Sequence, residues 1–340
     1  IINGAMVIDQ RNAGASVTPT ADQTYTLDRW ISRLNVASKF SVQQQTSVVP
    51  AGYTYALKAT SLSAYTAGTS EYFGIAQYIE GFNSSDLAWG TANAQTVTLS
   101  FKVYSSLTGT FGGCVFAYQS QSSASYPFTY TISSANTWTT ITITIPGPTS
   151  GTWNSTNSGN IVVNFSLGAG TTLSGTANTW SYTTAYYSAT GATSVVGTNG
   201  ATFYITGVQL EVGSQATNFE WRPYSLELSM CQRYYWSSNS NLNYFTFYRG
   251  IGSAYSTTQV GFLIQLPVTM RTSQSSVSYT GSLVLTDTVN NFSFTGITIN
   301  QTNPDSPLLF VSGATGLTQF RPYYLLAQSF STLLGISAEL

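Results

Sequence analysis

Apolar and polar residues alternate along several stretches of this chain. In TVTLSFKVYSS, residues 96–106, the apolar positions of one face are Val97, Leu99, Phe101 and Val103. Successive side chains of a strand point to opposite faces, so this period of two predicts a half-buried β-strand. Near the start of the chain, YTLDRW (residues 25–30) predicts an edge strand with Trp30 as a core residue.

Similar stretches recur further along the chain. TWTTITITIPG (137–147) predicts a strand with four inward residues, Trp138, Ile141, Ile143 and Ile145. ATFYITGVQLEVG (201–213) predicts the last strand of the same region, with one face formed by Tyr204, Val208, Leu210 and Val212. Turn-rich segments such as PGPTSGTWNSTNSGN (146–160) separate these strands, because proline and glycine interrupt a ladder. Short strands with such turns predict an all-β fold, an antiparallel β-sandwich of the jelly-roll kind.

The pattern changes between residues 219 and 233. YSLELSMCQRYY (224–235) places Leu226, Met230 and Tyr234 on one face of a short helix, with Pro223 at its first position. Charged residues gather around this helix, and the predicted junction and assembly residues are Glu220, Arg222, Glu227 and Arg233. We interpret them as fixing one domain against the next.

Beyond the helix the β pattern returns. The run GFLIQLPV (261–268) is nearly continuous in apolar residues, as expected for a strand buried on both faces or in an oligomer interface. The predicted organisation is a jelly-roll domain over residues 1–218, a junction with a short helix over 219–233, and a smaller C-terminal β domain over 234–340.

Charged residues make up only 7% of the 340 residues, against roughly 25% in an average soluble protein. The eleven Lys and Arg residues are scattered singly, which argues against nucleic acid as a partner. No apolar run reaches the roughly 20 residues that span a bilayer, and IINGAMVIDQ lacks the features of a signal peptide. We therefore expect no membrane insertion and assembly in a cytosol. Cys114 and Cys231 are expected to be buried small hydrophobic residues without a disulfide.

The chain contains no histidine, which removes histidine-based acid–base catalysis and most zinc sites. No motif marks a catalytic carboxylate pair, although Glu71, Glu80 and Asp86 stay open as carboxylates of a hydrolase. The sequence predicts no enzyme and no cofactor. A structural Ca²⁺ is a minor alternative, and its candidate ligands are Asp9, Asp28 and Glu211.

Aromatic and amide side chains are abundant, which suits sugar binding through ring stacking and neutral hydrogen bonds. Five aromatic residues lie in polar loops and are the candidate glycan-stacking residues: Trp89, Trp153, Trp180, Tyr186 and Tyr187. For each of them, packing in the core is the alternative. The loop SSNSNLNYF (237–245) is the alternative location for a ligand.

Five motifs together suggest a family. TGVQLEVGSQATNFEWRPYSLELSMCQRYY (206–235) is the longest, with INGAMVIDQRNAG (2–14) and YTLDRW ahead of it, and LPVTMR (266–271) and the terminal SAEL behind it. This order of motifs resembles bacteriophage tail-fibre or fibre-like virion proteins with a carbohydrate-binding-module-like jelly roll.

The resemblance implies a galactose-binding-like β-sandwich, a short junction helix and a C-terminal β domain, assembled as a homotrimer and exposed on the virion. It also implies that the junction residues, with Cys231 and Tyr234, are architectural. Other virion proteins and host cell-surface glycans are the implied partners. Two further functions stay open, a capsid decoration or tail-associated protein without a ligand, and a polysaccharide depolymerase.

Overall fold

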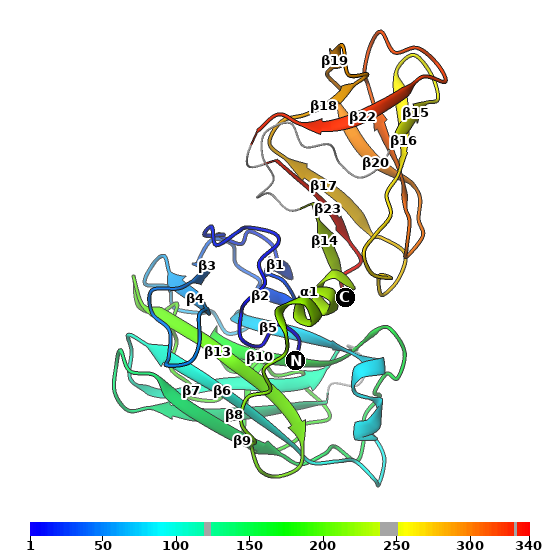
Figure 1. Ribbon diagram of the computed structural model, residues 1–340. Coiled ribbons are helices and arrows are strands. Elements are labelled where there is room, and N and C mark those ends of the chain that lie inside the picture. Colours follow the sequence, from blue (N-terminus) through cyan, green and yellow to red (C-terminus); the bar gives the residue numbers. More distant parts are fainter. Residues whose placement is uncertain (119–123, 239–250, 330–331) are drawn as a thin grey trace. The chain divides into compact units, whose positions relative to one another are not determined.

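The computed structural model describes residues 1–118, 124–238, 251–329 and 332–340 (Figure 1). The chain separates into two compact units, Ile1–Tyr224 with Leu340, and Ser225–Glu339. Regular structure is almost entirely β, with one α-helix among the described residues, which confirms the all-β fold class. In the described part of the chain, no helix has the length and apolar character needed to cross a membrane.

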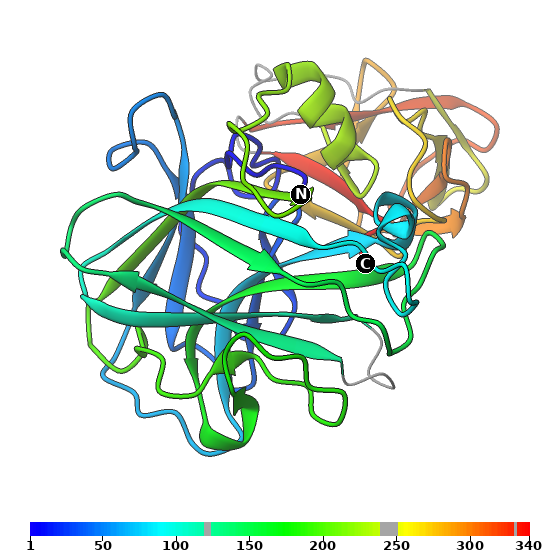
Figure 2. The ribbon, with the colours of Figure 1, turned by 90° about the horizontal axis from the view of Figure 1, so that it is seen from below.

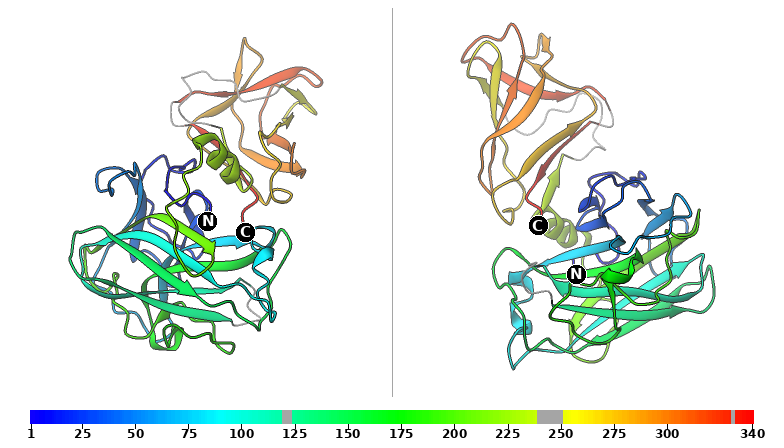
Figure 3. Two further views of the ribbon diagram at one scale, coloured as in Figure 1. Left: turned by 60° about the horizontal axis from the view of Figure 1, so that its bottom comes forward. Right: turned by 180° about the vertical axis from the view of Figure 1, so that it is seen from behind.

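The first unit is a sandwich of two antiparallel sheets. The six-stranded sheet has the order β1 (Thr24–Leu27), β2 (Trp30–Leu34), β5 (Tyr72–Glu80), β10 (Gly159–Ala169), β7 (Gly109–Ala117) and β8 (Ser125–Ile132). The five-stranded sheet has the order β3 (Phe40–Gln45), β4 (Ala56–Ser61), β13 (Thr202–Val212), β6 (Val97–Ser105) and β9 (Thr139–Ile145). Figures 2 and 3 follow the same strands, coloured blue to green, from other directions. Three sequential pairs, β1–β2, β3–β4 and β7–β8, are neighbours within a sheet, and the other connections between these strands cross from one sheet to the other, as in a jelly roll.

Short elements complete this unit. They are the parallel pair β11 (Ser174–Gly175) and β12 (Ser188–Ala189), and the 3₁₀ turns η1 (Gly81–Asn83), η2 (Ser85–Leu87) and η3 (Thr171–Leu173).

The core of the first unit lies between the two sheets and follows the predicted alternation. Val97, Leu99 and Val103 of β6 are fully buried, and Phe101 nearly so. Trp30 is fully buried and donates its indole N–H to the backbone oxygen of Asn3 at 3.0 Å. The predicted core residues are confirmed, because each of these strands has one face on the core. The prediction of a single edge strand over residues 25–30 is wrong, because β1 ends at Leu27, a turn follows, and Trp30 begins β2, which lies between β1 and β5.

Strand β13 differs from the prediction, which placed Tyr204, Val208, Leu210 and Val212 on a single face. Its pairing with β6 shifts between Thr206 and Gln209, which marks a β-bulge. Before the bulge Phe203 and Ile205 face the core, and after it Val208 does. Tyr204 therefore lies on the opposite face from Val208, and Val212 is exposed, in contrast to the predicted single face.

Trp138 is also placed differently from the prediction. Ile141, Ile143 and Ile145 of β9 pack against the core, as expected. Trp138 contacts Tyr104 at 5.6 Å between ring centroids and Tyr204 at 6.4 Å, on the outer face of the five-stranded sheet. Trp138 is an odd number of residues away from each of the three isoleucines, so the alternation of side chains along a strand places it on the opposite face of the sheet.

The second unit contains two antiparallel sheets around its own core. The smaller has the order β14 (Tyr235–Ser237), β23 (Leu333–Ser337) and β17 (Ser276–Thr280). The larger has the order β19 (Asn291–Phe292), β18 (Leu283–Thr286), β22 (Pro322–Ala327), β15 (Gly252–Ala254), β16 (Gln259–Leu263), β21 (Leu308–Ser312) and β20 (Gly296–Gln301).

The apolar run 261–268 is not buried on both faces within this chain. Phe262, Ile264 and Leu266 are buried in the core of the second unit, whereas Leu263 is 59% exposed. The run therefore alternates like a strand with one covered face. The exposed Leu263 leaves the oligomer-interface interpretation open.

The predicted helix is present as α1 (Tyr224–Gln232), but its buried face differs. Glu227 and Cys231 are buried, whereas Leu226 is half exposed. Cys114 and Cys231 are both buried free thiols, as predicted. Of the three residues predicted to form the apolar face, Tyr234 is fully buried but lies beyond the end of the helix, Met230 is partly buried, and Leu226 is exposed.

Candidate functional site

Three of the predicted stacking residues lie together in the first unit. The ring centroids of Trp89 and Trp153 are 4.8 Å apart, those of Trp89 and Trp180 are 5.7 Å apart, and all three rings meet edge to face. Trp89 is only 6% exposed, while Trp153 and Trp180 are half-buried. Trp153, Trp180 and the neighbouring Tyr182 thus supply the accessible surface of this cluster.

The indole N–H groups of this cluster hold the surrounding loops. Trp89 donates to the oxygen of Gln95 at 2.8 Å, and Trp180 donates to the oxygen of Pro146 at 2.7 Å. Trp153 donates to the oxygen of Ser150 at 3.1 Å. Their polar edges are therefore used for packing, and only ring faces are available for a ligand.

Tyr186 and Tyr187, the other two predicted stacking residues, lie on the outer face of the six-stranded sheet. Tyr187 stacks on Tyr72 with ring centroids 4.2 Å apart and an angle of 11°. Tyr186 packs against the same outer-face cluster, which includes Tyr78 and Phe116. The alternative loop 237–245 lies largely outside the described residues, which end at Ser238 and resume at Ile251.

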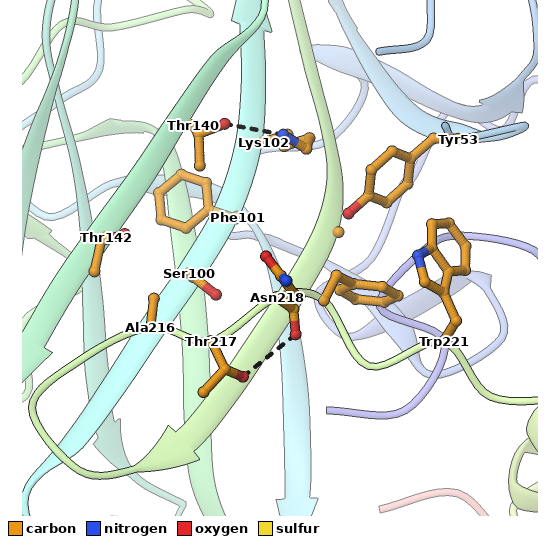
Figure 4. Close-up of a pocket in the computed structure, with 12 residues that line it drawn as sticks. Tyr53, Ser100, Phe101, Lys102, Thr140, Thr142, Ala216, Thr217, Asn218 and Trp221 are labelled. Atoms are coloured by element: carbon orange, nitrogen blue, oxygen red, sulfur yellow. Dashed lines mark hydrogen bonds between the residues drawn. The ribbon is translucent and has the colours of Figure 1, made fainter. Parts of the chain in front are cut away.

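A pocket of about 490 Å³ lies on the outer face of the five-stranded sheet (Figure 4). Figure 4 shows Tyr53 and Trp221 on one side of it and Thr140 and Thr142 on the other. The Tyr53 and Trp221 ring centroids are 4.8 Å apart, and Phe219 completes an aromatic wall at 5.7 Å from Tyr53. We refer to it as the Trp221 pocket.

The opposite wall of the Trp221 pocket is polar. Lys102 and Ser100 come from β6, and Thr140 and Thr142 from β9, so alternation in two paired strands brings them to one face. The Lys102 Nζ donates to Thr140 Oγ1 at 2.9 Å. An ammonium group carries three donors, so Lys102 keeps capacity for a further acceptor.

Glu211 and Gln209 hold the aromatic wall in place. The Glu211 carboxylate accepts hydrogen bonds from the Thr217 backbone N–H, the Thr217 hydroxyl and the Gln209 amide, at 2.5 to 2.9 Å. Gln209 Oε1 accepts from the backbone N–H of Glu220 at 2.8 Å. The segment after β13 is thus fastened along the sheet, which positions Phe219 and Trp221.

The bulge in β13 makes room for Tyr53. Gly207 has φ +62°, and a Cβ at this position would lie 2.5 Å from the Tyr53 hydroxyl. Only glycine combines this backbone conformation with so close an approach. Burial raises the pKa of Tyr53, so its hydroxyl stays protonated at neutral pH.

The three candidate Ca²⁺ ligands have other partners. Asp28 is fully buried and accepts hydrogen bonds from the backbone N–H and side-chain amide of Gln10, each at 2.6 Å. Asp9 accepts from the backbone N–H groups of Asn12 and Gly14. Glu211 is bound to Thr217 and Gln209, as described above. No three metal-ligating side chains of the described residues gather into a site.

Of the candidate hydrolytic carboxylates, Glu71 and Glu80 do not form a facing pair. Glu71 precedes β5 and Glu80 ends it, so nine residues of extended strand separate them, about 30 Å. Glycosidase pairs lie roughly 5–9.5 Å apart. Asp86 is exposed on η2, and none of these carboxylates lines the Trp221 pocket.

The predicted junction residues divide between the two units. Arg222 pairs with Glu220 at 3.2 Å and donates to the backbone oxygen of Ile1 at 3.1 Å, which ties the end of the first unit to its beginning. Glu227 is buried in α1, and Arg233 follows the helix, where its backbone oxygen accepts from Arg271 N–H at 2.7 Å.

Tyr53, Lys102, Phe219 and Trp221 were not predicted as site residues. Tyr53 and Trp221 are distant in sequence, and no local motif connects them. The glycine inside the β13 pattern was the available signal, because a glycine within a strand marks a bulge or a close approach.

No protein family and no curated protein matches this chain in sequence. Among solved structures, the chain is similar to a carbohydrate-binding module, CBM4, with 16% identity over 62% of this chain and 98% of that one, and a TM-score of 0.33. It is also similar to the family 11 carbohydrate-binding module of a cellulosomal cellulase of Clostridium thermocellum, with 13% identity over 60% of this chain and 99% of the module, and a TM-score of 0.30.

A third similar structure is the enzymatically active domain of tailspike protein 4 of bacteriophage CBA120. The identity is 11%, the TM-score is 0.32, and the match covers 59% of this chain but only 21% of the tailspike chain. Values this low leave the function of the present chain to be inferred from its own residues.

Proposed function

We propose that this chain is a non-enzymatic structural protein of a phage virion, a tail fibre or fibre-like component, whose first unit attaches to glycans on the host surface. The sequence motifs of residues 206–235 and their flanking segments support the virion assignment through their resemblance to such proteins. An exposed location on the particle also suits a surface built from hydroxyls and amides, with charged residues at 7%.

The Trp221 pocket is the observation that carries the glycan part of the proposal. Its volume of about 490 Å³ lies within the range of small-molecule sites, roughly 300–1,000 Å³. Trp221 is 54% exposed, so its ring face is accessible to a sugar ring, while Lys102 and the threonine hydroxyls opposite can bond sugar hydroxyl groups. The absence of a carboxylate from its lining favours binding over hydrolysis.

Trp221→Ala is expected to raise the Kd for a neutral oligosaccharide at least about tenfold, or about 1.4 kcal/mol. The reason is the loss of the most exposed ring of the aromatic wall. Kd values near 1 mM are expected for one site, so NMR chemical-shift titration of the full chain with a panel of neutral gluco- and galacto-oligosaccharides is the suitable measurement.

Tyr182→Ala is the matched control, because Tyr182 is another exposed aromatic residue and stacks beside Trp180 outside the pocket. It should leave the Kd unchanged. If Tyr182→Ala weakens binding and Trp221→Ala does not, the ligand lies on the tryptophan cluster instead. If no oligosaccharide of the panel binds, the decoration-protein alternative takes the place of this proposal.

We also propose that the chain assembles as a homotrimer, as the sequence resemblance implies. Leu263, Val289 and Phe320 of the second unit are large apolar residues more than half exposed in the single chain, and assembly would cover such surface. Light scattering coupled to gel filtration should give three times the 36.5 kDa chain mass. A mass of one chain at micromolar concentration would contradict the trimer.

A further inference from the structure

A second pocket, of about 340 Å³, lies on the outer face of the six-stranded sheet, opposite in the sandwich to the face that carries the Trp221 pocket. Its lining includes a cation among aromatic and apolar side chains, namely Arg33, Tyr78, Phe116, Tyr118, Val162 and Tyr187. These residues come from β2, β5, β7, β10 and the adjoining segments. We refer to it as the Arg33 pocket.

Arg33 is only 5% exposed, and four aromatic rings surround its guanidinium group. The guanidinium carbon lies 5.2 Å from the ring centroid of Tyr187, 5.6 Å from that of Tyr72, and 5.9 Å from those of Tyr78 and Phe116. Cation–π attraction contributes most where the cation is desolvated, as here. The rings therefore stabilise a buried positive charge in the lining of the pocket.

One side of the guanidinium is occupied by protein. Arg33 Nε donates to Asp22 Oδ1 at 3.0 Å, and Nη2 donates to the Tyr187 hydroxyl at 3.4 Å. The Asp22 carboxylate also accepts from the Leu34 backbone N–H at 2.9 Å and the Tyr72 hydroxyl at 3.1 Å. Asp22 thus binds the Nε side of Arg33 and is held there by two further donors.

The Nη1 side of Arg33 has a different environment. The two hydrogen bonds described above come from Nε and Nη2, and a guanidinium carries five donors in a planar fork. A desolvated cation of this kind attracts an anion more strongly than one in water. The planar fork favours a carboxylate, and the faces of Tyr78, Phe116 and Tyr187 suit the C–H face of a sugar ring.

We propose that the Arg33 pocket binds a carboxylate-bearing sugar residue of the hexuronate class. The site extends the proposed glycan attachment to acidic polymers, and it shares no residue with the Trp221 pocket, so the two proposals fail independently. In this arrangement the ligand carboxylate meets the Nη1 edge of Arg33, and the sugar ring lies against the surrounding aromatic rings.

The test is an NMR titration of the full chain with D-glucuronate and with D-glucuronamide, which has nearly the same shape but no charge. Glucuronate should bind at least about tenfold more tightly than the amide, with shift changes at Tyr187 and Val162. Equal affinities would overturn the proposal. Acetate binding as tightly as glucuronate would also overturn it, because the sugar ring would then contribute nothing.

Two variants distinguish the loss of the binding site from a loss of folding. Arg33→Gln should abolish the preference for glucuronate, but it also removes the partner of Asp22. Ala185→Trp fills the pocket from its lining, leaves the Arg33–Asp22 pair in place, and should abolish binding of glucuronate equally. A folded Ala185→Trp protein that still prefers glucuronate would refute the location.

The matched control is Arg321→Gln. Arg321 also pairs with an aspartate, Asp287 at 3.2 Å, but belongs to the second unit. This variant should keep the preference of the wild type. Loss of the preference in Arg321→Gln would show that the general loss of a positive charge, and not the Arg33 pocket, governs the binding of glucuronate.

Discussion

Replacing Trp30 by alanine is expected to lower the free energy of unfolding of the first unit by about 3–5 kcal/mol. The indole is fully buried at the start of β2 and packs against Phe165, with ring centroids 6.3 Å apart. The change leaves a large cavity between the sheets and removes the N–H that Asn3 O accepts at 3.0 Å. Urea unfolding followed by tryptophan fluorescence measures the loss, because six of the seven tryptophans lie in the first unit.

Trp221→Ala is the matched control for this experiment. It removes the same atoms from a side chain that is 54% exposed, so the expected loss is below about 1 kcal/mol. Equal losses in the two variants would mean that the core between the sheets does not dominate the stability of this unit.

Asp28→Asn is expected to be more stable than the wild type at pH 7, by up to about 3 kcal/mol. Burial raises the pKa of Asp28 from 3.8 to about 6, although Arg11 and the hydrogen bonds from Gln10 act in the opposite direction. Between pH 3.8 and about pH 6, the carboxyl group of Asp28 is protonated in the folded state and ionised in the unfolded state. The stability contributed by protonated Asp28 is therefore complete below pH 4 and is lost as the pH rises through 6.

Asparagine has nearly the same shape as aspartic acid but does not titrate, so the variant lacks the pH dependence of stability that Asp28 causes. The Gln10 amide can turn so that its oxygen faces the new amide group, and the Gln10 backbone N–H keeps an oxygen acceptor. Unfolding free energies of both proteins at pH 4 and pH 7 provide the measurement. Asp9, whose pKa burial also raises, is common to both proteins and cancels in the comparison. A difference between the two proteins that is the same at both pH values would contradict the assignment.

The alternation of apolar residues predicted the sandwich because its strands have one face on a single core. It was correct for β6 and for Trp30, where side-chain parity and burial agree. It was wrong for Tyr204, because the bulge at Gly207 shifts the side-chain parity by one residue, and the alternation of apolar residues alone does not register such a shift. The predicted buried face of the helix was wrong for another reason. Hydrophobicity favoured Leu226 as the buried residue, whereas the structure buries Glu227 and Cys231 and exposes Leu226.

The candidate sites were predictable only in part. Loop position and residue type selected three tryptophans that the structure brings together and Tyr187, which lines the Arg33 pocket. The same reasoning missed Arg33, because a single basic residue in a strand looks like a solvent-facing position. It missed Tyr53 and Trp221 because their contact depends on how the segment after β13 folds back over the sheet. Whether any of these residues binds a glycan remains a prediction.

The bulge at Gly207 also bears on how the chain finds its fold. In a regular strand over Thr202–Val212, Phe203 and Ile205 would lie on one face and Val208 and Leu210 on the other. Either register would therefore bury one pair and leave the other pair on the outer face. With the bulge, only one alignment against β4 and β6 buries both pairs. Since β13 lies at the centre of its sheet, this one kink excludes slipped pairings of its neighbours as well. A strand that buries its apolar residues in one alignment alone is a poor template for mispairing with the strands of other copies.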